Sequence, residues 1–337
     1  MPIIDVHAHL ISAEAIEGLQ RELPDYAPVF EDRPAGRFLT YPSGRASGPL
    51  PAGMTDLTVR LADMDRTGID VQLLSPSPPQ FGYGLPGDAS AVHSRIVNDA
   101  TLALAGQAPE RFLVLLTLPL PHLDAAFAEL DRVGSDPFVR GVELGANIGG
   151  MNLDDPSLEP LWVELERRNL FVLVHAAPAE APQYERHFLR NLVGNPADST
   201  LAIASLIFGG VAERHPRLAF CFVHGGGFAP YQIGRWDRGW NLREDLHRSI
   251  PRPPSSYLEQ FYFDTLTHDT ASLEFLGARV GWPHVVLGSD YCFDMASDDP
   301  VGDVRALHLD PTDEQAVLGD TIASIFGRAQ PKRRDPS

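Results

Sequence analysis

Short apolar runs recur along the whole chain, and stretches with helical periodicity separate most of them. Eight runs rich in branched and aromatic residues lie at 3–9, 71–75, 112–118, 139–144, 171–175, 218–224, 261–264 and 285–289. Because these runs are continuous rather than alternating, they are typical of parallel strands buried on both faces. Apolar residues three and four positions apart predict helices at 89–108, 123–132, 158–168 and 200–214.

Eight strands that alternate with helices predict an α/β fold, a (β/α)8 TIM barrel, which takes about 250 residues. The residues beyond this length fall in two segments. One is an insertion at about 19–56 after the first strand, and the other is the segment 178–199 after the fifth. Both follow the carboxyl end of a strand, where barrel enzymes carry active-site loops. We expect one barrel domain over 1–328 and a flexible tail over 329–337. A doubly wound sheet is the alternative, disfavoured because no G-x-G-x-x-G turn follows a strand.

Composition narrows the class of protein. The chain has 337 residues, 44% hydrophobic and 21% charged, which is enough for a substantial core. Its 27 Lys and Arg against 45 Asp and Glu give a net charge of −18, which disfavours nucleic acid or an anionic membrane as a partner. Asp5 and His7 break the N-terminal apolar stretch, so we expect no signal peptide, and no apolar run is long enough to span a membrane. Two cysteines, Cys221 and Cys292, favour a reducing, cytoplasmic setting.

Candidate chemistry begins in the first run, where His7 and His9 are separated by one residue. In a strand, residues i and i+2 point to the same face, so both imidazoles converge on one point. This arrangement suits a metal ion, although a lone pair of histidines is also compatible with a surface or core position.

Three later strands also finish in an ionisable residue, namely His175, His224 and Asp290. Side chains at the carboxyl ends of barrel strands point into the mouth of the barrel. Burying one such group without a partner costs roughly 1–3 kcal/mol, so five around one rim need mutual contacts or a cation. We therefore predict that His7, His9, His175 and Asp290 hold one divalent metal ion. Nitrogen and oxygen ligands without thiolate favour Zn²⁺, with Mn²⁺ or Fe²⁺ as alternatives.

His224 is predicted to be a general acid/base rather than a ligand, because imidazole titrates near neutral pH. Two alternatives stay open. His224 could be a further ligand, or its ring could fix the Gly225-Gly226-Gly227 turn through a hydrogen bond.

These residues resemble the amidohydrolase superfamily, whose members are TIM barrels of the metal-dependent hydrolase type. More narrowly, the chain is similar to the 2-amino-3-carboxymuconate-6-semialdehyde decarboxylase branch of that superfamily. The similar segments are Ile4-Asp5-Val6-His7-Ala8-His9, Phe81-Gly82-Tyr83, His224-Gly225-Gly226-Gly227, Arg252-Pro253-Pro254-Ser255 and Leu287-Gly288-Ser289-Asp290-Tyr291. The resemblance covers nearly the whole chain, and the order of the segments makes it specific.

The resemblance implies a mononuclear zinc enzyme, often a homodimer, that removes a carboxyl group from a small-molecule carboxylate. Binuclear relatives carry a modified lysine at the end of the fourth strand, where this chain has Gly141-Val142-Glu143-Leu144, so one metal is expected. Arg235 corresponds to an arginine that binds the substrate carboxylate across a dimer interface, and Phe293 to a pocket aromatic. The family's second substrate arginine has no match, although Arg45 is close, and the aromatic after the fifth strand is replaced near Asn191. A muconate-type dicarboxylate is therefore not implied.

Two enzyme functions use the same residues. The first is a nonoxidative decarboxylase of an aromatic or enoic carboxylate, in which His224 takes a proton from water or substrate and carbon protonation precedes release of carbon dioxide. The second is a hydrolase of a lactone, amide or related bond, or a hydratase, in which Asp290 or His224 takes a proton from the attacking water. A barrel with a purely structural metal is the third possibility, and zinc removal that abolishes folding would favour it.

Overall fold

The computed structural model describes residues 2–177 and 181–327. The tail predicted at 329–337 lies outside the described residues. Within the described part of the chain, no helix combines the length and the apolar character needed to cross a membrane.

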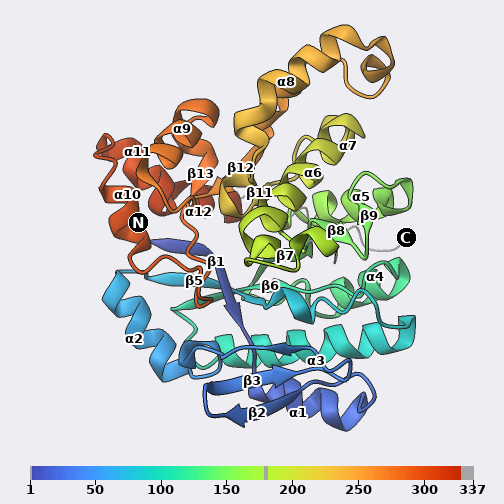
Figure 1. Ribbon diagram of the computed structural model, residues 1–337, viewed down its shortest axis with the longest axis vertical. Helices are drawn as coiled ribbons and strands as arrows, with labels where there is room; N and C mark the ends of the chain where they lie inside the picture. Colours follow the sequence, from blue (N-terminus) through green and yellow to red (C-terminus); the bar gives the residue numbers. More distant parts are fainter. Residues whose placement is uncertain (1, 178–180, 328–337) are drawn as a thin grey trace, which may run out of the picture.

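A curled, eight-stranded parallel sheet forms the centre of the molecule, and its strand order follows the chain (Figure 1). Its strands are β1 (Ile4–Leu10), β5 (Val71–Pro76), β6 (Phe112–Leu116), β7 (Val139–Gly145), β10 (Phe171–His175), β11 (Phe220–Phe222), β12 (Phe261–Asp264) and β13 (Val285–Val286). The two ends of this order also approach each other. The Val6 amide donates to the Leu287 carbonyl at 2.9 Å, and Ala8 forms a parallel bridge with Tyr291. The chain that follows β13 therefore lies beside β1.

Helices surround this sheet, and most of them connect consecutive strands. They are α1 (Ala13–Glu22), α2 (Leu57–Thr67), α3 (Gly87–Ala105), α4 (Leu123–Val133), α5 (Glu159–Arg168), α6 (Asn195–Phe208), α7 (Val211–Arg214), α8 (Ala229–Leu242), α9 (Thr270–Val280), α10 (Pro300–Arg305), α11 (Pro311–Gln315) and α12 (Thr321–Phe326). Helix α8 projects away from the body of the molecule (Figure 1).

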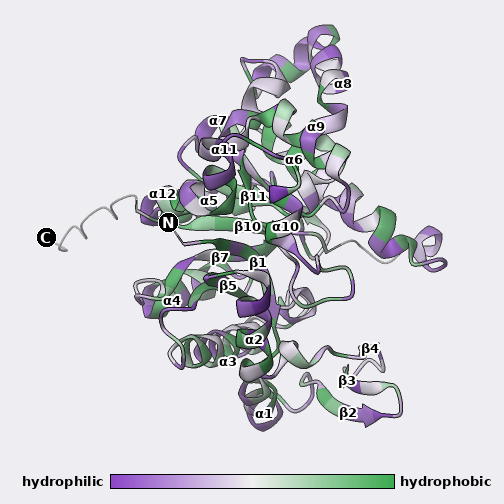
Figure 2. Ribbon diagram, turned by 90° about the vertical axis from the view of Figure 1, so that its left-hand side faces the viewer, coloured by the Kyte–Doolittle hydropathy of each residue, from purple (hydrophilic) through white to green (hydrophobic). Residues whose placement is uncertain are grey.

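Two short sheets lie outside the central one. An antiparallel sheet of β2 (Val29–Arg33), β3 (Gly36–Thr40) and β4 (Ala46–Ser47) protrudes from the side toward which the central strands run (Figure 2). This small sheet lies within the segment that the sequence marks as an insertion at 19–56, although its status as an insertion stays a prediction. The second is the hairpin of β8 (Asn147–Ile148) and β9 (Met151–Asn152).

The strands alternate between two apolar clusters on opposite faces of the sheet. In β10, Val172 and Val174 join the large cluster shared with the surrounding helices, which we call the outer cluster. Phe171 and Leu173 join a smaller inner cluster, to which α12 contributes Ile322 and Ile325. Since Phe171 begins β10, α12 covers the amino-terminal end of the sheet. The carboxyl ends of the strands carry buried polar residues, among them His9, His175 and Asp264.

The structure corrects some predicted boundaries. The helix predicted at 200–214 is two helices, α6 and α7, because Gly210 adopts a left-handed conformation with φ of 73°. The runs at 218–224 and 285–289 pair over only three and two residues. Beyond both strands a ligating or acid/base candidate adopts a left-handed conformation, His224 with φ of 56° and Asp290 with φ of 58°.

Candidate metal centre and active site

A bulge in β1 decides which way its two histidines point. Asp5 pairs with Gln72 and Ala8 with Leu74, so three steps along β1 oppose two along β5. Before the bulge, Ile4 belongs to the inner cluster, and after it Leu10 belongs to the outer one. The extra residue turns His7 and His9 toward the inner face, which His175 also shares through its alternation with Phe171 and Leu173.

His7, His9, His175 and Asp290 converge at the carboxyl ends of the strands. One ligand atom from each lies within 4.8 Å of those of the other three, and all four residues are buried. The His7 and His9 Nε2 atoms are 3.1 Å apart, and each is 3.3 Å from Asp290 Oδ1. We call these four residues the His/Asp cluster; they are the residues that the sequence proposes as ligands.

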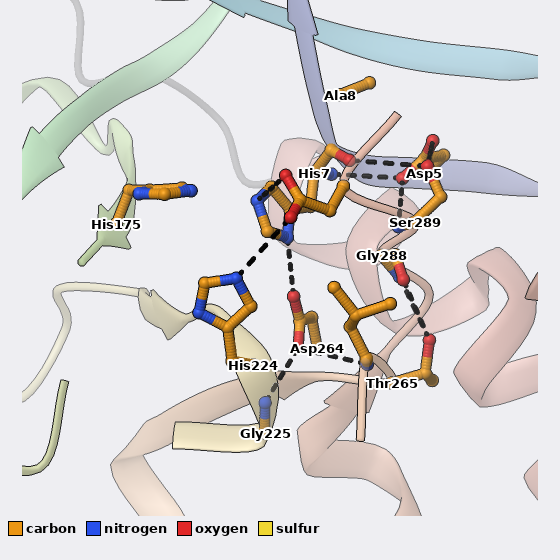
Figure 3. A network of polar contacts seen from close by, with 12 residues as sticks. Asp5, His7, Ala8, His175, His224, Gly225, Asp264, Thr265, Gly288 and Ser289 are labelled. Carbon is orange, nitrogen blue, oxygen red and sulfur yellow. Dashed lines mark hydrogen bonds and ion pairs between the residues drawn. The ribbon is translucent and has the colours of Figure 1, made fainter. Parts of the chain in front are cut away.

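Hydrogen bonds at the Nδ1 atoms of His7 and His175 orient these two rings. Asp264, the last residue of β12, contacts His7 Nδ1 through Oδ2 at 2.7 Å (Figure 3). The Ala176 carbonyl lies 2.8 Å from His175 Nδ1. Both acceptors require a proton on Nδ1, so in the neutral rings Nε2 carries the lone pair. An imidazole fixed in this way is what a metal ion needs as a ligand.

Burial and charge set the protonation of the cluster. Burial lowers the pKa of His9 to about 4 and lowers that of His175 well below its usual range. Burial also opposes a charge on His7, but the carboxylates of Asp290 and Asp264 outweigh it and raise the pKa of His7. Burial alone would raise the pKa of Asp290. His7 and the neighbouring histidines outweigh that effect, so the pKa of Asp290 lies well below its usual value. Neutral imidazoles around an ionised carboxylate are thereby favoured, except at His7, where a cation would compete with the proton.

The unpartnered atoms of the cluster fit a divalent cation. His175 Nε2 and Asp290 Oδ1 are buried without a hydrogen-bond partner. Leaving such atoms unsatisfied costs roughly 1–3 kcal/mol each, and a metal bound between them would remove that cost. Three imidazole nitrogens and one carboxylate oxygen form a donor set that divalent transition metals accept.

His224 lies next to the cluster on a turn that only glycines can complete. Its Nε2 is 3.7 Å from Asp290 Oδ2, while its Nδ1 is buried without a hydrogen-bond partner. The three following residues, Gly225, Gly226 and Gly227, all have positive φ. A Cβ on Gly227 would come within 2.0 Å of the Pro196 carbonyl oxygen. The Gly225 amide donates to Asp264 Oδ1, so Asp264 holds both this turn and His7 (Figure 3).

Several buried polar residues around the cluster were not assigned a role from the sequence. Asp264 ends an apolar strand just as His175 does, so the same signal could have found it. Asp5 accepts hydrogen bonds from the His7 amide, the Ser289 amide and hydroxyl, and Gln72, and thereby ties β1 to the segment that carries Asp290. Glu143 of β7 is buried 3.8 Å from His9 Nδ1, and burial raises its pKa to about 8. It occupies the region where binuclear relatives carry the bridging lysine.

The remaining candidates lie in three different places. The Phe293 ring packs on His9, with 5.1 Å between centroids. Arg235 is exposed on α8, the projecting helix, and does not line the cavity described below. Arg45 is exposed in the turn before β4 and does not line it either.

A cavity of about 600 Å³ adjoins His224. Its walls come from the segment after β10 and the start of α6, from the glycine turn and α8, from the chain after β12 with α9, and from Met295. Asn191, near which the resemblance predicts that a family aromatic is replaced, lines it. Volumes of this size are typical of pockets for small organic ligands.

A family model described as Amidohydrolase matches residues 4–328. Because the match spans nearly all of the sequence, this chain belongs to the amidohydrolase family.

Several individual proteins of known name are similar to this chain. A 2-amino-3-carboxymuconate-6-semialdehyde decarboxylase from Dictyostelium discoideum is 36% identical over 291 residues, which cover 84% of this chain and 80% of that protein. A gamma-resorcylate decarboxylase from a Rhizobium species is 28% identical over 261 residues, covering 71% and 78%. The solved 5-carboxyvanillate decarboxylase from Sphingomonas paucimobilis has a TM-score of 0.80 at 22% identity, covering 96% and 98%. That structural likeness concerns the fold.

Proposed function

We propose that this protein is a metal-dependent nonoxidative decarboxylase, a carboxy-lyase that acts on an aromatic or enoic carboxylate. The observation that carries the proposal is the His/Asp cluster with His224 beside it, Nε2 lying 3.7 Å from Asp290 Oδ2. The names of the relatives from Dictyostelium and Rhizobium support decarboxylation rather than hydrolysis.

In this proposal His7, His9, His175 and Asp290 hold one divalent metal, with Zn²⁺ favoured by the donor set over Mn²⁺ or Fe²⁺. When bound, the metal would act as a Lewis acid on an oxygen of the substrate. Asp264 keeps His7 in the tautomer that leaves Nε2 free, and Asp290 stays ionised and faces His224. Phe293, whose ring packs on His9, would contact the reacting part of the substrate.

His224 is the residue that handles the proton. It takes a proton from a substrate hydroxyl or a water and delivers a proton to the carbon that bears the carboxylate. A carbon–hydrogen bond forms, the carbon–carbon bond to the carboxylate breaks, and its electron pair restores the π system as carbon dioxide leaves. The net change is the replacement of a carboxylate by hydrogen, which needs no oxidant.

The finer features of the molecule belong to the same proposal. We infer a closed TIM barrel over 1–328, which the Val6–Leu287 hydrogen bond and the Ala8–Tyr291 bridge support. We also infer a cytoplasmic homodimer in which Arg235 of the partner subunit binds the substrate carboxylate. The exposure of Arg235 on α8, where it does not line the cavity of its own chain, supports this arrangement.

The first experiment measures metal content and follows carbon dioxide release and oxygen-18 incorporation from water across hydroxybenzoates, aminobenzoates and muconate-type acids. We expect about one metal per chain, release of carbon dioxide and no solvent oxygen in the product. In His224→Asn, which retains a side chain suited to positive φ, kcat should fall by about 10²- to 10⁴-fold while metal content stays unchanged.

The matched control is His247→Gln, an exposed histidine far along the chain from the cluster, which should retain wild-type kcat. Solvent oxygen in the product without carbon dioxide would instead make the protein a hydrolase or hydratase. Protein that binds no metal would refute the ligand assignment, and equal kcat in His224→Asn and wild type would refute the role of His224.

A further inference from the structure

The cavity beside His224 is lined by residues other than the four proposed metal ligands. None of the four cluster residues lines it, whereas His224, Gly225 and Gly227 do. His224 therefore separates the cluster from the cavity. A substrate whose reacting carbon lies at His224 would extend its remaining atoms into this space.

The walls of the cavity are apolar over most of their extent. Six large apolar side chains line it: Leu192 from the segment after β10, Phe228 and Tyr231 from the start of α8, Leu266 from the chain after β12, Phe275 from α9 and Met295 from the chain after β13. Tyr231 and Phe275 meet across the gap between α8 and α9, with 5.8 Å between ring centroids. Several of them also stay partly open to solvent, Phe275 being 44% exposed and Leu192 50%. Apolar side chains left exposed around a concavity are typical of a ligand site.

The described residues that line this cavity include no acidic or basic side chain of the carboxylate, ammonium or guanidinium type, that is, no Asp, Glu, Lys or Arg. Its polar groups are hydroxyls, amides and two imidazoles, contributed by Asn191, Asn195, Thr267, Ser272, His224 and His268. Transferring a second carboxylate from water into such surroundings is costly because none of these lining residues carries a cation that would pair with it. An alkyl or aryl group, by contrast, would lose water-exposed apolar area against the walls.

We propose that this cavity receives an uncharged, largely apolar substituent, so that the preferred substrates are aromatic monocarboxylates with an alkyl or aryl group. The inference rests on the proposed decarboxylation and adds the chemical class of the substrate's distal part. The neutral groups on the wall can accept or donate a hydrogen bond to a hydroxyl on the substituent without requiring a charge.

The test compares 2-hydroxybenzoates that carry hydrogen, methyl, ethyl, propyl or carboxylate at each free ring position, with the metal-loaded full chain. At one position kcat/KM should rise by about 3- to 4-fold for each added carbon, the gain expected from burying one methylene. The carboxylate-bearing acid should be at least 10-fold poorer than the propyl one. Calorimetric dissociation constants for the corresponding phenols, which are the products, should follow the same order.

Ala271→Arg tests the absence of charge directly. Ala271 lines the cavity from the exposed start of α9, and arginine is a good helix former, so the substitution should fold. We expect the ratio of kcat/KM for the propyl acid to that for the carboxylate acid to fall at least 10-fold. Ala271→Leu, of neutral charge, should keep the preference for the propyl acid. Val163→Arg, exposed on α5 outside the cavity, should leave the ratio unchanged.

The outcomes separate this inference from the function on which it rests. Carbon dioxide release with no dependence on chain length, or with a preference for the dicarboxylate, would overturn the inference and leave the decarboxylase standing. A preference for the dicarboxylate would also place a cation of the partner subunit in the cavity. No carbon dioxide from any acid would overturn the decarboxylase itself.

Discussion

Asp264 contacts both a proposed metal ligand, His7, and the turn that carries the proposed acid/base, His224. One of its carboxylate oxygens accepts a hydrogen bond from the His7 ring, and the other accepts from the Gly225 amide just after His224. The same side chain therefore fixes a proposed ligand and the turn of the proposed acid/base. Its contact with His7 joins residues 257 positions apart, so no local sequence pattern could reveal the pair.

Asp264→Asn should weaken metal binding by about 10- to 100-fold, the usual loss when the partner of a ligating histidine is changed. Asparagine has nearly the same shape, but it lacks the negative charge that favours the Nδ1–H tautomer of His7. The dissociation constant can be measured by competition with a chromogenic chelator. Asp245→Asn, at an exposed carboxylate paired with Arg243, serves as the control and should bind metal as wild type does. Equal affinities in the two variants would show that Asp264 does not support the ligand.

Other residues could be predicted from the sequence because each one carries its own signal. An ionisable residue at the end of an apolar strand is visible without a structure and marks His175, His224 and Asp290, while the spacing of one residue marks His7 and His9. Arg60 has no such signal. It lies within a helix whose periodicity gives no reason to bury it, yet only 2% of its surface is exposed.

Among the elements, the eight strands of the central sheet and the helices α3 to α6 could be predicted, because long apolar runs and helical periodicity are strong signals. The exceptions arise where tertiary contacts override the pattern. The bulge in β1 shifts the facing of His7 and His9 relative to Ile4, and nothing in the alternation of the run marks it. The helix predicted at 200–214 ignores Gly209 and Gly210, where the chain turns before α7.

Helix α2 is joined to the site by Arg60. Its guanidinium donates to the Gly53 carbonyl at 3.2 Å, to Gln72 Oε1 at 3.1 Å and to the His9 carbonyl. It also lies 4.8 Å from the centre of the Tyr291 ring, next to Asp290. One buried side chain on α2 therefore holds β1, β5 and the segment that follows Asp290.

Arg60→Met should lower the free energy of unfolding by about 3 kcal/mol, because three buried acceptors lose their donor and methionine offers none. Urea unfolding of the full chain measures this value. Arg66→Met, on the same helix but with an exposed side chain, should change it by about 0.5 kcal/mol or less. If both variants unfold at the same urea concentration, the Arg60 contacts do not stabilise the protein.

At the scale of the whole molecule, the parallel sheet explains why residues from distant parts of the sequence meet. All eight strands run the same way, so their carboxyl ends lie at one end of the curled sheet, and α12 covers the other. The His/Asp cluster draws on β1, β10 and the chain after β13. One proposed substrate residue, Arg235, does not follow this rule, because it lies on a helix that leaves the body of the molecule.

The dimer proposal makes a quantitative prediction for mixed variants. Arg235→Ala and His224→Ala proteins should each be inactive alone. After dissociation and random reassociation of equal amounts, half of the dimers are mixed, and each mixed dimer has one site with His224 and the partner's Arg235 both intact. About one quarter of wild-type activity should therefore return. If Arg235 serves the site of its own chain, every site in the mixture carries one lesion, and no activity returns. Mixing Arg235→Ala with the double variant gives the baseline, since neither chain then supplies the missing arginine.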